Sequence, residues 1–535
     1  MTTPPPLVTK RGIIHLCKIS ILFLDREFEN DVYELIKAFF PEGEIRVSYV
    51  EDSCGEEYKE CEWRFRIERA GDSFQIRYSS EAHSGVACVS VIKGQSSDAL
   101  LSCGGEEAEG CPEAPEKLSG QDSQELRRQN KDCIKYALYG VLVKLTQKTL
   151  PWGDLTGIRP AKLAMGMLES GMKNTEIAKE LRERYLVSPQ KAALAITIAN
   201  REREILKDID YENGYSLYIG IPFCPSICLY CSFSSYPLKQ WKTRVDAYLD
   251  ALCKEIQAVS AMVKGRKLDT IYIGGGTPTT LEPEQLKRLL HTVGEGFGYD
   301  GLEEFTIEAG RPDSITREKL LAIREFPVSR ISVNPQTMNQ ATLDIIGRRH
   351  TVEETRSAFY LARECGYNNI NMDLIVGLPG EDISMVGNTL EQVRALAPDS
   401  LTVHSLAVKR AARLNMFRDQ YQEMTFENNQ EIMDLTMKTA YEMGMGPYYL
   451  YRQKNMKGNF ENVGYAKVDK AGIYNILIME EKQPIIALGA GGSSKLVFDH
   501  GKRIERVENV KDVTNYIARI DEMIERKRTG IKTWL

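Results

Sequence analysis

Short apolar runs alternate with stretches of helical period between residues 213 and 407, and this alternation constrains the fold more than any other feature. The six runs are SLYIGIP, TIYIGGG, EFTIEAG, RISVNPQ, NMDLIVGLP and SLTVHSL. Strands that are apolar almost throughout, with helices between them, predict a parallel sheet covered by helices. Six units are fewer than the eight of a closed TIM barrel, so we predict an α/β fold, a partial (β/α)6 barrel. In such folds the chemistry lies at the C-terminal rim of the sheet.

Four further regions flank the predicted barrel. Residues 1–95 combine alternating strand-like runs with one amphipathic helix, DVYELIKAFF, and predict a small α+β domain. Residues 96–125 are rich in Gly, Ser, Glu and Pro, which predicts a low-complexity linker or insert. Helical periods fill 126–212. Residues 408–535 form a mixed α/β extension that we expect to cover the substrate, with IYNILIM as a further apolar strand before the loop ALGAGGSSK.

Composition excludes several classes of protein. The 69 Lys and Arg residues nearly balance the 75 Asp and Glu residues, so no chain-wide basic field exists to hold nucleic acid. No apolar run approaches the ~20 residues of a membrane helix, and the start MTTPPPLVTKRG lacks a signal-peptide core. Twelve cysteines in 535 residues are too sparse for a secreted disulfide scaffold. We therefore expect a cytoplasmic protein.

The strongest chemical signal is the segment IPFCPSICLYC, which places Cys224, Cys228 and Cys231 directly after the first barrel strand. Three cysteines within eight residues on a loop suggest a shared soft metal. Zinc usually takes a fourth protein ligand, and no second CxxC pair follows at zinc-finger spacing. A [4Fe–4S] cluster held by three cysteines would keep one iron open to a substrate or cofactor. A zinc site and a chance group of buried cysteines remain as alternatives.

The second strand ends in a run of glycines, Gly274-Gly275-Gly276, followed by Thr277. Glycines at a strand end allow the backbone to approach a ligand closely and to donate N–H groups to it. A glycine run alone is weak evidence, because most such runs are turns.

The CxxxCxxC loop, with Tyr230 before its last cysteine, resembles the radical S-adenosylmethionine (SAM) enzymes from Leu217 to about Lys409. The resemblance implies that the three cysteines hold a [4Fe–4S] cluster. The open iron would take the amino and carboxylate groups of SAM, and reduction would cleave SAM to a 5′-deoxyadenosyl radical. The barrel would protect that radical from water. The glycine run then resembles the family's motif for the methionine moiety of SAM.

LYIGIPFC, GGGTPT, TIEAG, RISVNPQTMN, IGRRHT and NMDLIVGLPGE occur in the order seen in oxygen-independent coproporphyrinogen oxidases. LPWGDLTGIRPAKL (150–163) and YYLYRQKNMKGNFENVGY (448–465) are similar to the HemZ branch of that group. The resemblance implies contacts to a cluster-bound SAM at Tyr218, Tyr230, Gly275 and Glu308. It implies contacts to a second SAM at Gly276, Thr277, Gln336, Arg348, Asp373 and Ala407.

Tyr218 is the one residue that we predict to be catalytic. For the acidic residues Glu308 and Asp373, at strand ends, the alternative is that each caps a neighbouring helix. The sequence departs from the family at Gly220, where the pattern Tyr-x-His-Ile-Pro-Phe-Cys has histidine. This change removes an imidazole near the cluster and bears on how the cluster is tuned or a proton is handled.

The resemblance implies oxidative decarboxylation of two propionates of coproporphyrinogen III to vinyl groups. Partners would be that tetrapyrrole and a flavodoxin- or ferredoxin-type electron donor. A substrate with four propionates needs fixed cations and an apolar wall. Candidate cations are Lys409, Arg410, Arg413, Arg311, Arg330 and Arg159, with solvated surface charges as the alternative. The rival functions are a haem chaperone of the HemW type, another radical SAM reaction on a porphyrin, and a zinc-stabilised structural protein.

Other features are weaker. Cys103 and Cys111 lie in the low-complexity insert and are better explained as exposed thiols than as a metal clip. Cys253 and Cys365 fall in helical periods and are predicted to be small core residues. His350 and His404 could act as acid or base, but packed or ligand-orienting roles are commoner, so neither is assigned to catalysis. The GAGG of 489–492 fits a nucleotide contact or a turn.

Overall fold

A computed structural model describes most of the chain. The residues described are 17–23, 27–41, 43–49, 61–70, 73–80, 84–90, 120–156, 159–233, 235–407, 412–416, 425–453 and 459–534. Of the predicted insert of 96–125, residues 96–119, with Cys103 and Cys111, lie outside them, and so do Lys409 and Arg410. The prediction is wrong for residues 120–125, which form the first turns of a helix that runs from Gly120 to Thr146. The chain divides into two compact units, one of residues 1–157 and 178–192 and the other of 158–177 and 193–535.

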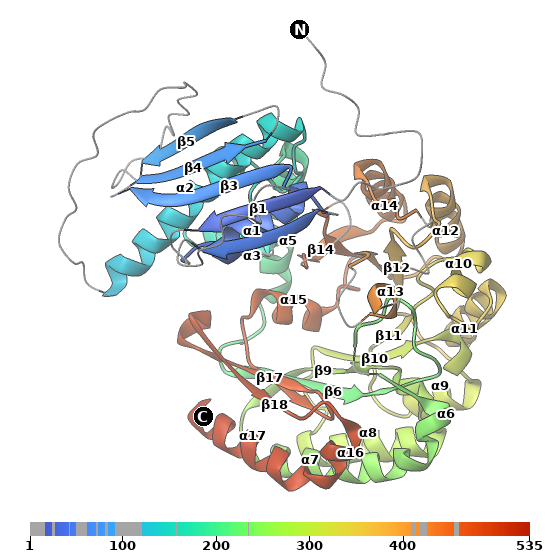
Figure 1. The fold of residues 1–535 in the computed structure, drawn as a ribbon. Coiled ribbons are helices and arrows are strands. Elements are labelled where there is room, and N and C mark those ends of the chain that lie inside the picture. The colour runs from blue at the N-terminus through green and yellow to red at the C-terminus, as the bar shows by residue number, and fades with distance from the viewer. Residues whose placement is uncertain are drawn as a thin grey trace. The chain divides into compact units, whose positions relative to one another are not determined.

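The first unit is built on a five-stranded sheet in the order β2-β1-β3-β4-β5 (Figure 1). The strands are β1 (Lys18–Phe23), β2 (Glu44–Tyr49), β3 (Trp63–Ala70), β4 (Ser73–Ser79) and β5 (Ser84–Ser90). β1 runs parallel to both of its neighbours, and the remaining pairs are antiparallel. Helices α1 (Glu29–Phe39) and α2 (Gly120–Thr146) pack on the sheet, which confirms the predicted strands and the amphipathic helix.

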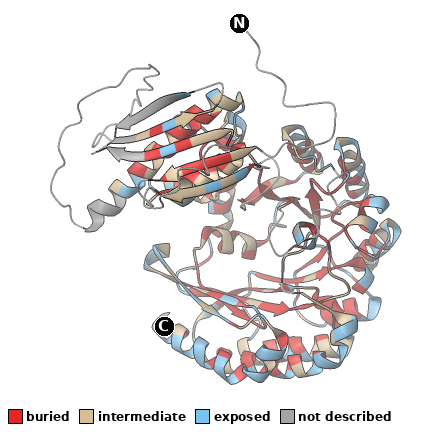
Figure 2. Cartoon of the chain, in the orientation of Figure 1, coloured by how far each residue is buried: buried red, intermediate tan, exposed pale blue. Residues whose placement is uncertain are grey.

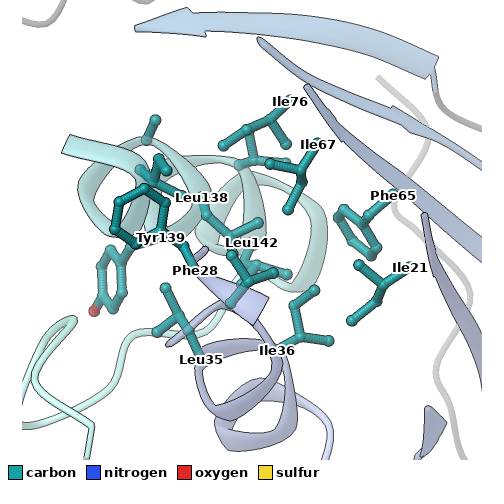
Figure 3. Close-up of a cluster of buried hydrophobic side chains, with 14 of the residues drawn as sticks. Ile21, Phe28, Leu35, Ile36, Phe65, Ile67, Ile76, Leu138, Tyr139 and Leu142 are labelled. Atoms are coloured by element: carbon teal, nitrogen blue, oxygen red, sulfur yellow. The ribbon is translucent and has the colours of Figure 1, made fainter. Parts of the chain in front are cut away.

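The core of this unit forms where the apolar stripes of the helices meet the inward positions of alternating strands (Figure 3). Leu35 and Ile36 of α1 and Leu138 of α2 pack with Phe65 and Ile76 of the sheet, and all five are at most 1% exposed. At about 25 cal/mol per Å² of apolar surface, burial of such side chains is the main term that holds this sheet to its helices.

The second unit contains an eleven-stranded sheet in the order β14-β15-β13-β12-β11-β10-β9-β6-β16-β17-β18. Its six central strands are parallel and follow the chain in order: β6 (Gly214–Ile221), β9 (Lys267–Gly275), β10 (Glu304–Gly310), β11 (Arg330–Val333), β12 (Ile370–Val376) and β13 (Ser400–Ser405). The six predicted barrel strands are therefore confirmed. The short strands β7 (Phe223–Cys224) and β8 (Tyr236–Pro237) pair separately, after β6.

Helices cover the outer face of this sheet (Figure 1). They are α7 (Val245–Met262), α8 (Pro283–Phe297), α9 (Arg317–Arg324), α10 (Gln340–Ile345), α11 (Val352–Glu364) and α12 (Ile383–Leu396). Figure 2 shows the central strands largely buried and the outer sides of these helices exposed. Cys253 and Cys365 are buried, which confirms their predicted place in the core.

The remaining helices lie before the barrel, directly after β8, and in the C-terminal part. They are α3 (Pro160–Glu169), α4 (Asn174–Glu183), α5 (Pro189–Leu206), α6 (Leu238–Trp241), α13 (Arg413–Met416), α14 (Gln430–Glu442), α15 (Ile473–Glu480), α16 (Val513–Ala518) and α17 (Ile520–Trp534). Antiparallel strands β14 (Gly446–Tyr451) and β15 (Asn462–Ala466) extend the sheet beyond β13. Beyond β6, the sheet continues through β16 (Ile485–Leu488), β17 (Ser493–Phe498) and β18 (Arg503–Glu508).

One predicted element is wrong. The run IYNILIM is not a strand but most of helix α15. Short apolar runs do not distinguish a strand from a buried helix by period. The helix also has a tertiary partner at its start, because Ile473 N donates to the Glu304 carboxylate of β10 at 2.5 Å. The strand beside β6 is instead β16, from the following run.

No helix among the described residues is long and apolar enough to cross a lipid bilayer.

Candidate functional site

Three thiols lie in the segment that follows β6, one at the end of β7 and two on the loop after it. Cys228 is buried, Cys224 and Cys231 are half-buried, and all three are free of disulfides. The loop folds back on itself, since Cys231 N donates to Cys228 O at 3.2 Å. Burial raises the pKa of the Cys224 thiol to about 11, and the nearby Cys228 and Cys231 raise it further. The predicted ligands therefore lie together, at the C-terminal rim of the barrel.

Two buried guanidinium groups lie beside Cys228. Arg311 Nη1 is 3.7 Å from Cys228 Sγ, while its other nitrogens bind Asp313 at 2.9 and 2.7 Å. Arg348 is 5% exposed and interacts with Cys228 and Tyr230, both of which raise the pKa of the guanidinium against the effect of burial. Positive charge close to a thiol stabilises its thiolate, which is the form that binds metal.

The donor set fits an iron–sulfur cluster. In the part of the chain that the structure describes, no three His, Cys, Asp or Glu side chains are arranged to hold one metal ion. A cluster spreads its thiolate ligands over several irons. Three neighbouring cysteines that form no disulfide, with two cations beside them, suit that arrangement. Cys224, Cys228 and Cys231 would hold the cluster.

The glycine run packs against the backbone that leads into the cysteine loop. A Cβ on Gly276 would lie 2.5 Å from Phe223 O, and Gly275 has a φ of +110°, a conformation that residues with a side chain rarely adopt. Gly276 N and Thr277 N donate to Ile221 O and Phe223 O, both at 2.7 Å. These two amides therefore donate to backbone carbonyls and hold the rim strands together.

Thr277 also reaches the cysteine loop through its side chain. Its Oγ1 lies 3.6 Å from Cys224 Sγ, and the residue is 2% exposed. The hydrogen bond lowers the pKa of Cys224 against the larger effect of burial. Thr277 thus supports a cysteine directly, in addition to its predicted place near a second SAM.

The inner face of the barrel is polar and aromatic at the level of Tyr218. Tyr218 pairs in register with Tyr272, their rings stack 6.2 Å apart, and Tyr474 of α15 stacks on Tyr272 at 4.5 Å. Burial raises the pKa of Tyr218 above its usual range, and Glu308 raises it further. Tyr218 is therefore a neutral phenol that can donate one hydrogen bond.

Glu308 lies on β10 and accepts a hydrogen bond from Tyr272. Burial raises the pKa of Glu308 to about 7, although the bond from Tyr272 opposes that rise. A Cβ on Gly274 would lie 3.0 Å from this carboxyl, so the first glycine of the run makes room for it. The alternative of a helix cap is wrong here, because the next helix, α9, is capped by Thr316.

Asp373 on β12 faces His404 on β13, with 3.9 Å between Oδ2 and Nε2. Burial alone would raise the pKa of Asp373, but His404, Asn371 and Arg330 outweigh it and lower that pKa. His404 Nδ1 lies 3.3 Å from the hydroxyl of Tyr451. Asp373 does not cap α12, whose N-cap is Asp382. An ionised Asp373 can accept hydroxyl or ammonium groups of a ligand.

Several buried polar atoms of the fourth strand and its loop have no hydrogen-bond partner among the described residues. They are Ser332 Oγ, Asn334 Oδ1, Gln336 Oε1 and Arg348 Nε. Each such atom costs about 1–3 kcal/mol when it stays unsatisfied. Gln336 also has a φ of +69°, a rare conformation for a residue other than glycine. Strain and unpaired polar atoms in one place are typical of a site that a ligand completes.

The remaining residues singled out in the sequence differ in how deeply they are buried. Tyr230 is half-buried in the cysteine loop, and Ala407 is half-buried just after β13. His350 is fully buried near Arg348, and burial lowers its pKa to about 3, so it is a neutral imidazole. Gly220 is not forced by packing, since a Cβ there would keep 3.5 Å from its nearest neighbours.

The cations predicted to bind the propionates of the substrate are partly occupied by other partners. Asp313 already occupies the fork of Arg311, and Arg330 is 2% exposed at the start of β11, where it donates to Ser400 Oγ at 3.2 Å. Both are poorly placed for a substrate carboxylate. Arg413 is exposed, and Arg159 binds Glu481 at 2.7 Å.

Sequence patterns missed two aromatic residues of the site, Tyr272 and Tyr474. Tyr272 could have been found from strand register, because it occupies the position of Tyr218 on the adjacent strand. Tyr474 had no comparable signal, since its run was assigned to a strand. The glycines of 489–492 form a turn: Gly489 N donates to Glu255 Oε2 and Gly491 N to Val510 O.

Comparison with known proteins finds a superfamily model and two relatives. The model of the Radical SAM superfamily matches residues 218–393. The chain is 38% identical over 476 residues to the oxygen-independent coproporphyrinogen-III oxidase-like protein HemZ of Bacillus subtilis, covering 88% of this chain and 92% of that protein. It is 30% identical over 323 residues to the heme chaperone HemW of Lactococcus lactis, covering 59% of this chain and 79% of that one.

Among solved structures, coproporphyrinogen III oxidase (HemN) from Escherichia coli aligns with a TM-score of 0.48 and 24% identity, over 58% of this chain and 70% of that one. The near-complete match to HemZ and the matching superfamily model define the family. The chain belongs to the radical SAM superfamily and, within it, to the family of the coproporphyrinogen-III oxidase-like protein HemZ.

Proposed function

We propose that this chain catalyses the oxygen-independent oxidative decarboxylation of coproporphyrinogen III to protoporphyrinogen IX. Each of two propionates loses CO₂, one hydrogen atom from its β-carbon and one electron, and becomes a vinyl group. The hydrogen atom goes to the adenosyl radical derived from SAM, and the electron goes to an acceptor. The near full-length similarity to an oxidase-like relative supports this reaction.

The observation that carries the proposal is the group of buried, unpartnered polar atoms beside the cysteine loop. Ser332, Asn334 and Gln336 carry such atoms on β11 and just after it. Arg348 connects them to the loop, because it donates to Asn334 O and interacts with Cys228. A polar ligand bound next to the cluster would satisfy these atoms, and SAM carries ammonium, carboxylate and ribose groups of the required kinds.

The bound cluster and SAM supply one-electron reduction and a radical that abstracts hydrogen. This chain's residues bind and orient the reactants. We assign Tyr218 and Glu308 to a cluster-bound SAM and Asp373 to a second SAM, where its carboxylate accepts hydroxyl or ammonium groups. Tyr218, as a neutral phenol, donates a hydrogen bond and closes the inner wall against water.

The proposal extends to the partners. A flavodoxin- or ferredoxin-type protein would reduce the cluster. The substrate would be coproporphyrinogen III, and its reaction proceeds without oxygen.

A haem chaperone is the second candidate function. The similarity to HemW supports it, because that match covers 79% of a protein named as a heme chaperone. The two functions share the cysteine loop but differ in outcome. A chaperone binds and transfers haem without releasing CO₂, whereas the enzyme releases CO₂ in proportion to deoxyadenosine.

The test uses the full chain, reconstituted with iron and sulfide without oxygen, then incubated with SAM, a reductant and coproporphyrinogen III. We expect two molecules of CO₂ for each protoporphyrinogen formed, identified by mass. The matched control is Cys228→Ser, which should form neither product nor deoxyadenosine. Deoxyadenosine from the wild type without any porphyrin product would contradict the proposed reaction. Transfer of bound haem to an acceptor protein would then favour the chaperone.

A further inference from the structure

A small cavity lies beside the barrel, between α15 and the strands at its β6 edge. Its volume is about 150 Å³. Tyr218 and Tyr474 line one part, Ile485 and Ala487 of β16 line another, and Lys495 of β17 contributes a charged group. The cavity thus connects an aromatic wall of the candidate site to a cation 277 residues later in the chain.

Lys495 belongs to a cluster of three cations around one carboxylate. Glu481 follows α15 directly, and its side chain is 12% exposed. Arg159 Nη1 lies 2.7 Å and Lys495 Nζ 3.3 Å from Glu481 Oε1, while Lys162 Nζ lies 2.8 Å from Oε2. One carboxylate cannot neutralise three cations, so the cluster carries excess positive charge.

The neighbouring groups do not remove that excess. Lys482 is already paired with Glu169, with 2.5 Å between Nζ and Oε1. Burial raises the pKa of Glu480 to about 7, which disfavours its ionised form. A fourth cation, Arg506 of β18, lies directly opposite Lys495 in the antiparallel ladder. Like charges in directly opposed positions destabilise a sheet unless an anion compensates them.

The backbone at the carboxylate is also unusual. Glu481 has a φ of +54°, in the left-handed region that favours glycine. In this conformation the Glu481 carboxylate forms ion pairs with Arg159, Lys162 and Lys495. Burial lowers the pKa of Lys495, and the positive charge of Arg159 lowers it further. An arriving anion would relieve this repulsion.

We propose that Arg159, Lys162 and Lys495 form a carboxylate-binding subsite that takes one propionate of the tetrapyrrole substrate, with the apolar edge of its pyrrole against the cavity wall. This inference rests on the proposed function, since it identifies how the same site holds its substrate. A guanidinium fork and ammonium groups bind carboxylates through charge-assisted hydrogen bonds. Tyr474, Ile485 and Ala487 supply the apolar wall that such a substrate needs.

The test measures binding of coproporphyrin III, the fluorescent oxidised tetracarboxylate, to the full chain without turnover. We expect Lys495→Met and the double variant Arg159→Gln/Lys162→Gln each to raise the Kd about 10- to 100-fold, the range for losing a hydrogen bond to a charged group. Lys495→Arg should restore binding to within about threefold, because it keeps the charge. Circular dichroism of each variant establishes that it is folded.

Lys482→Gln is the matched control, since it removes a lysine beside Glu481 that is paired with Glu169. It should leave the Kd within about twofold if the three cations act specifically. An unchanged Kd in folded Lys495→Met, or equal losses in Lys482→Gln and Lys495→Met, would overturn the proposal.

The measurements distinguish failure of the proposed subsite from failure of the proposed reaction. If the wild type binds coproporphyrin III through the three cations but forms no protoporphyrinogen IX, the subsite stands and the reaction fails. If it forms the product and Lys495→Met has an unchanged KM, the reaction stands and the subsite fails.

Discussion

The buried ion pair between Lys527 of α17 and Glu255 of α7 gives a sharp test of how the C-terminal helices support the barrel. Both side chains are 0% exposed and lie 2.8 Å apart. Glu255 also accepts hydrogen bonds from Gly489 N at 2.9 Å and Tyr516 Oη at 2.6 Å. A Cβ on Gly489 would lie 2.6 Å from Gly220 O, so the turn is packed against the strand that leads to the cysteine loop.

The perturbation is Lys527→Met. It keeps most of the side-chain volume but leaves a buried carboxylate without its counter-charge, which costs about 3–5 kcal/mol. At 1.4 kcal/mol for each factor of ten, local opening of this region should become about 140- to 4,000-fold more frequent. The double variant Glu255→Gln/Lys527→Met removes both charges and should therefore be more stable than the single variant.

The assay is native-state hydrogen exchange followed by mass spectrometry on peptides that cover β16 and β17. Exchange reports the opening of this region by itself, which suits a chain with two compact units. A change below about tenfold in Lys527→Met would refute the reasoning. So would a double variant that opens as often as the single variant.

Three further predictions follow from the site and its surroundings. Gly276→Ala places a Cβ 2.5 Å from a backbone oxygen of β7, a clash that costs about 1–3 kcal/mol, so the iron bound per chain after reconstitution should fall. The control Gly220→Ala, whose Cβ would keep 3.5 Å from its neighbours, should bind as much iron as the wild type, and equal iron in the two variants would contradict this. Burial and mutual repulsion raise the pKa of Glu202 well above its usual range, and burial raises the pKa of Glu480 to about 7, so the folded state binds extra protons and its stability falls as pH rises from about 4.5 to 7. Glu202→Gln should therefore reduce the pH dependence of the thermal unfolding temperature between pH 5 and 8, and an unchanged pH dependence would contradict the assignment of this pair. Burial raises the pKa of Glu308 to about 7, so its ionised fraction increases with pH, and the SAM affinity of the wild type measured by calorimetry should increase from pH 6 to 8. Glu308→Gln should bind SAM more weakly and without that increase, and a variant whose affinity rises with pH as in the wild type would exclude the assigned contact.

The barrel could be predicted from sequence because its strands carry a local signal. Each of the six strands is a short apolar run, and each is separated from the next by helical periods. The cysteine spacing was equally local. The same reasoning failed for α15, because the run IYNILIM is mostly apolar and its hydrogen bond to Glu304, 169 positions earlier, is not visible in the sequence.

Other features of the site depend on contacts that no local pattern contains. The glycine run indicated close backbone approach, but only the structure shows that the backbone of β6 and β7 packs against it. The unusual backbone of Gln336 and the unpaired atoms near it are likewise invisible in sequence. Arg159 and Glu481 meet across more than three hundred residues, so their pairing follows from the fold alone.

Electron paramagnetic resonance of the reconstituted, reduced chain tests the central claim most directly. If Cys224, Cys228 and Cys231 hold a [4Fe–4S] cluster with one open iron, the reduced protein should give a cluster signal whose g-values shift when SAM is added. Replacing any one of the three by Ser should abolish it. A signal that SAM leaves unchanged, or iron retained in full by all three variants, would contradict the claim.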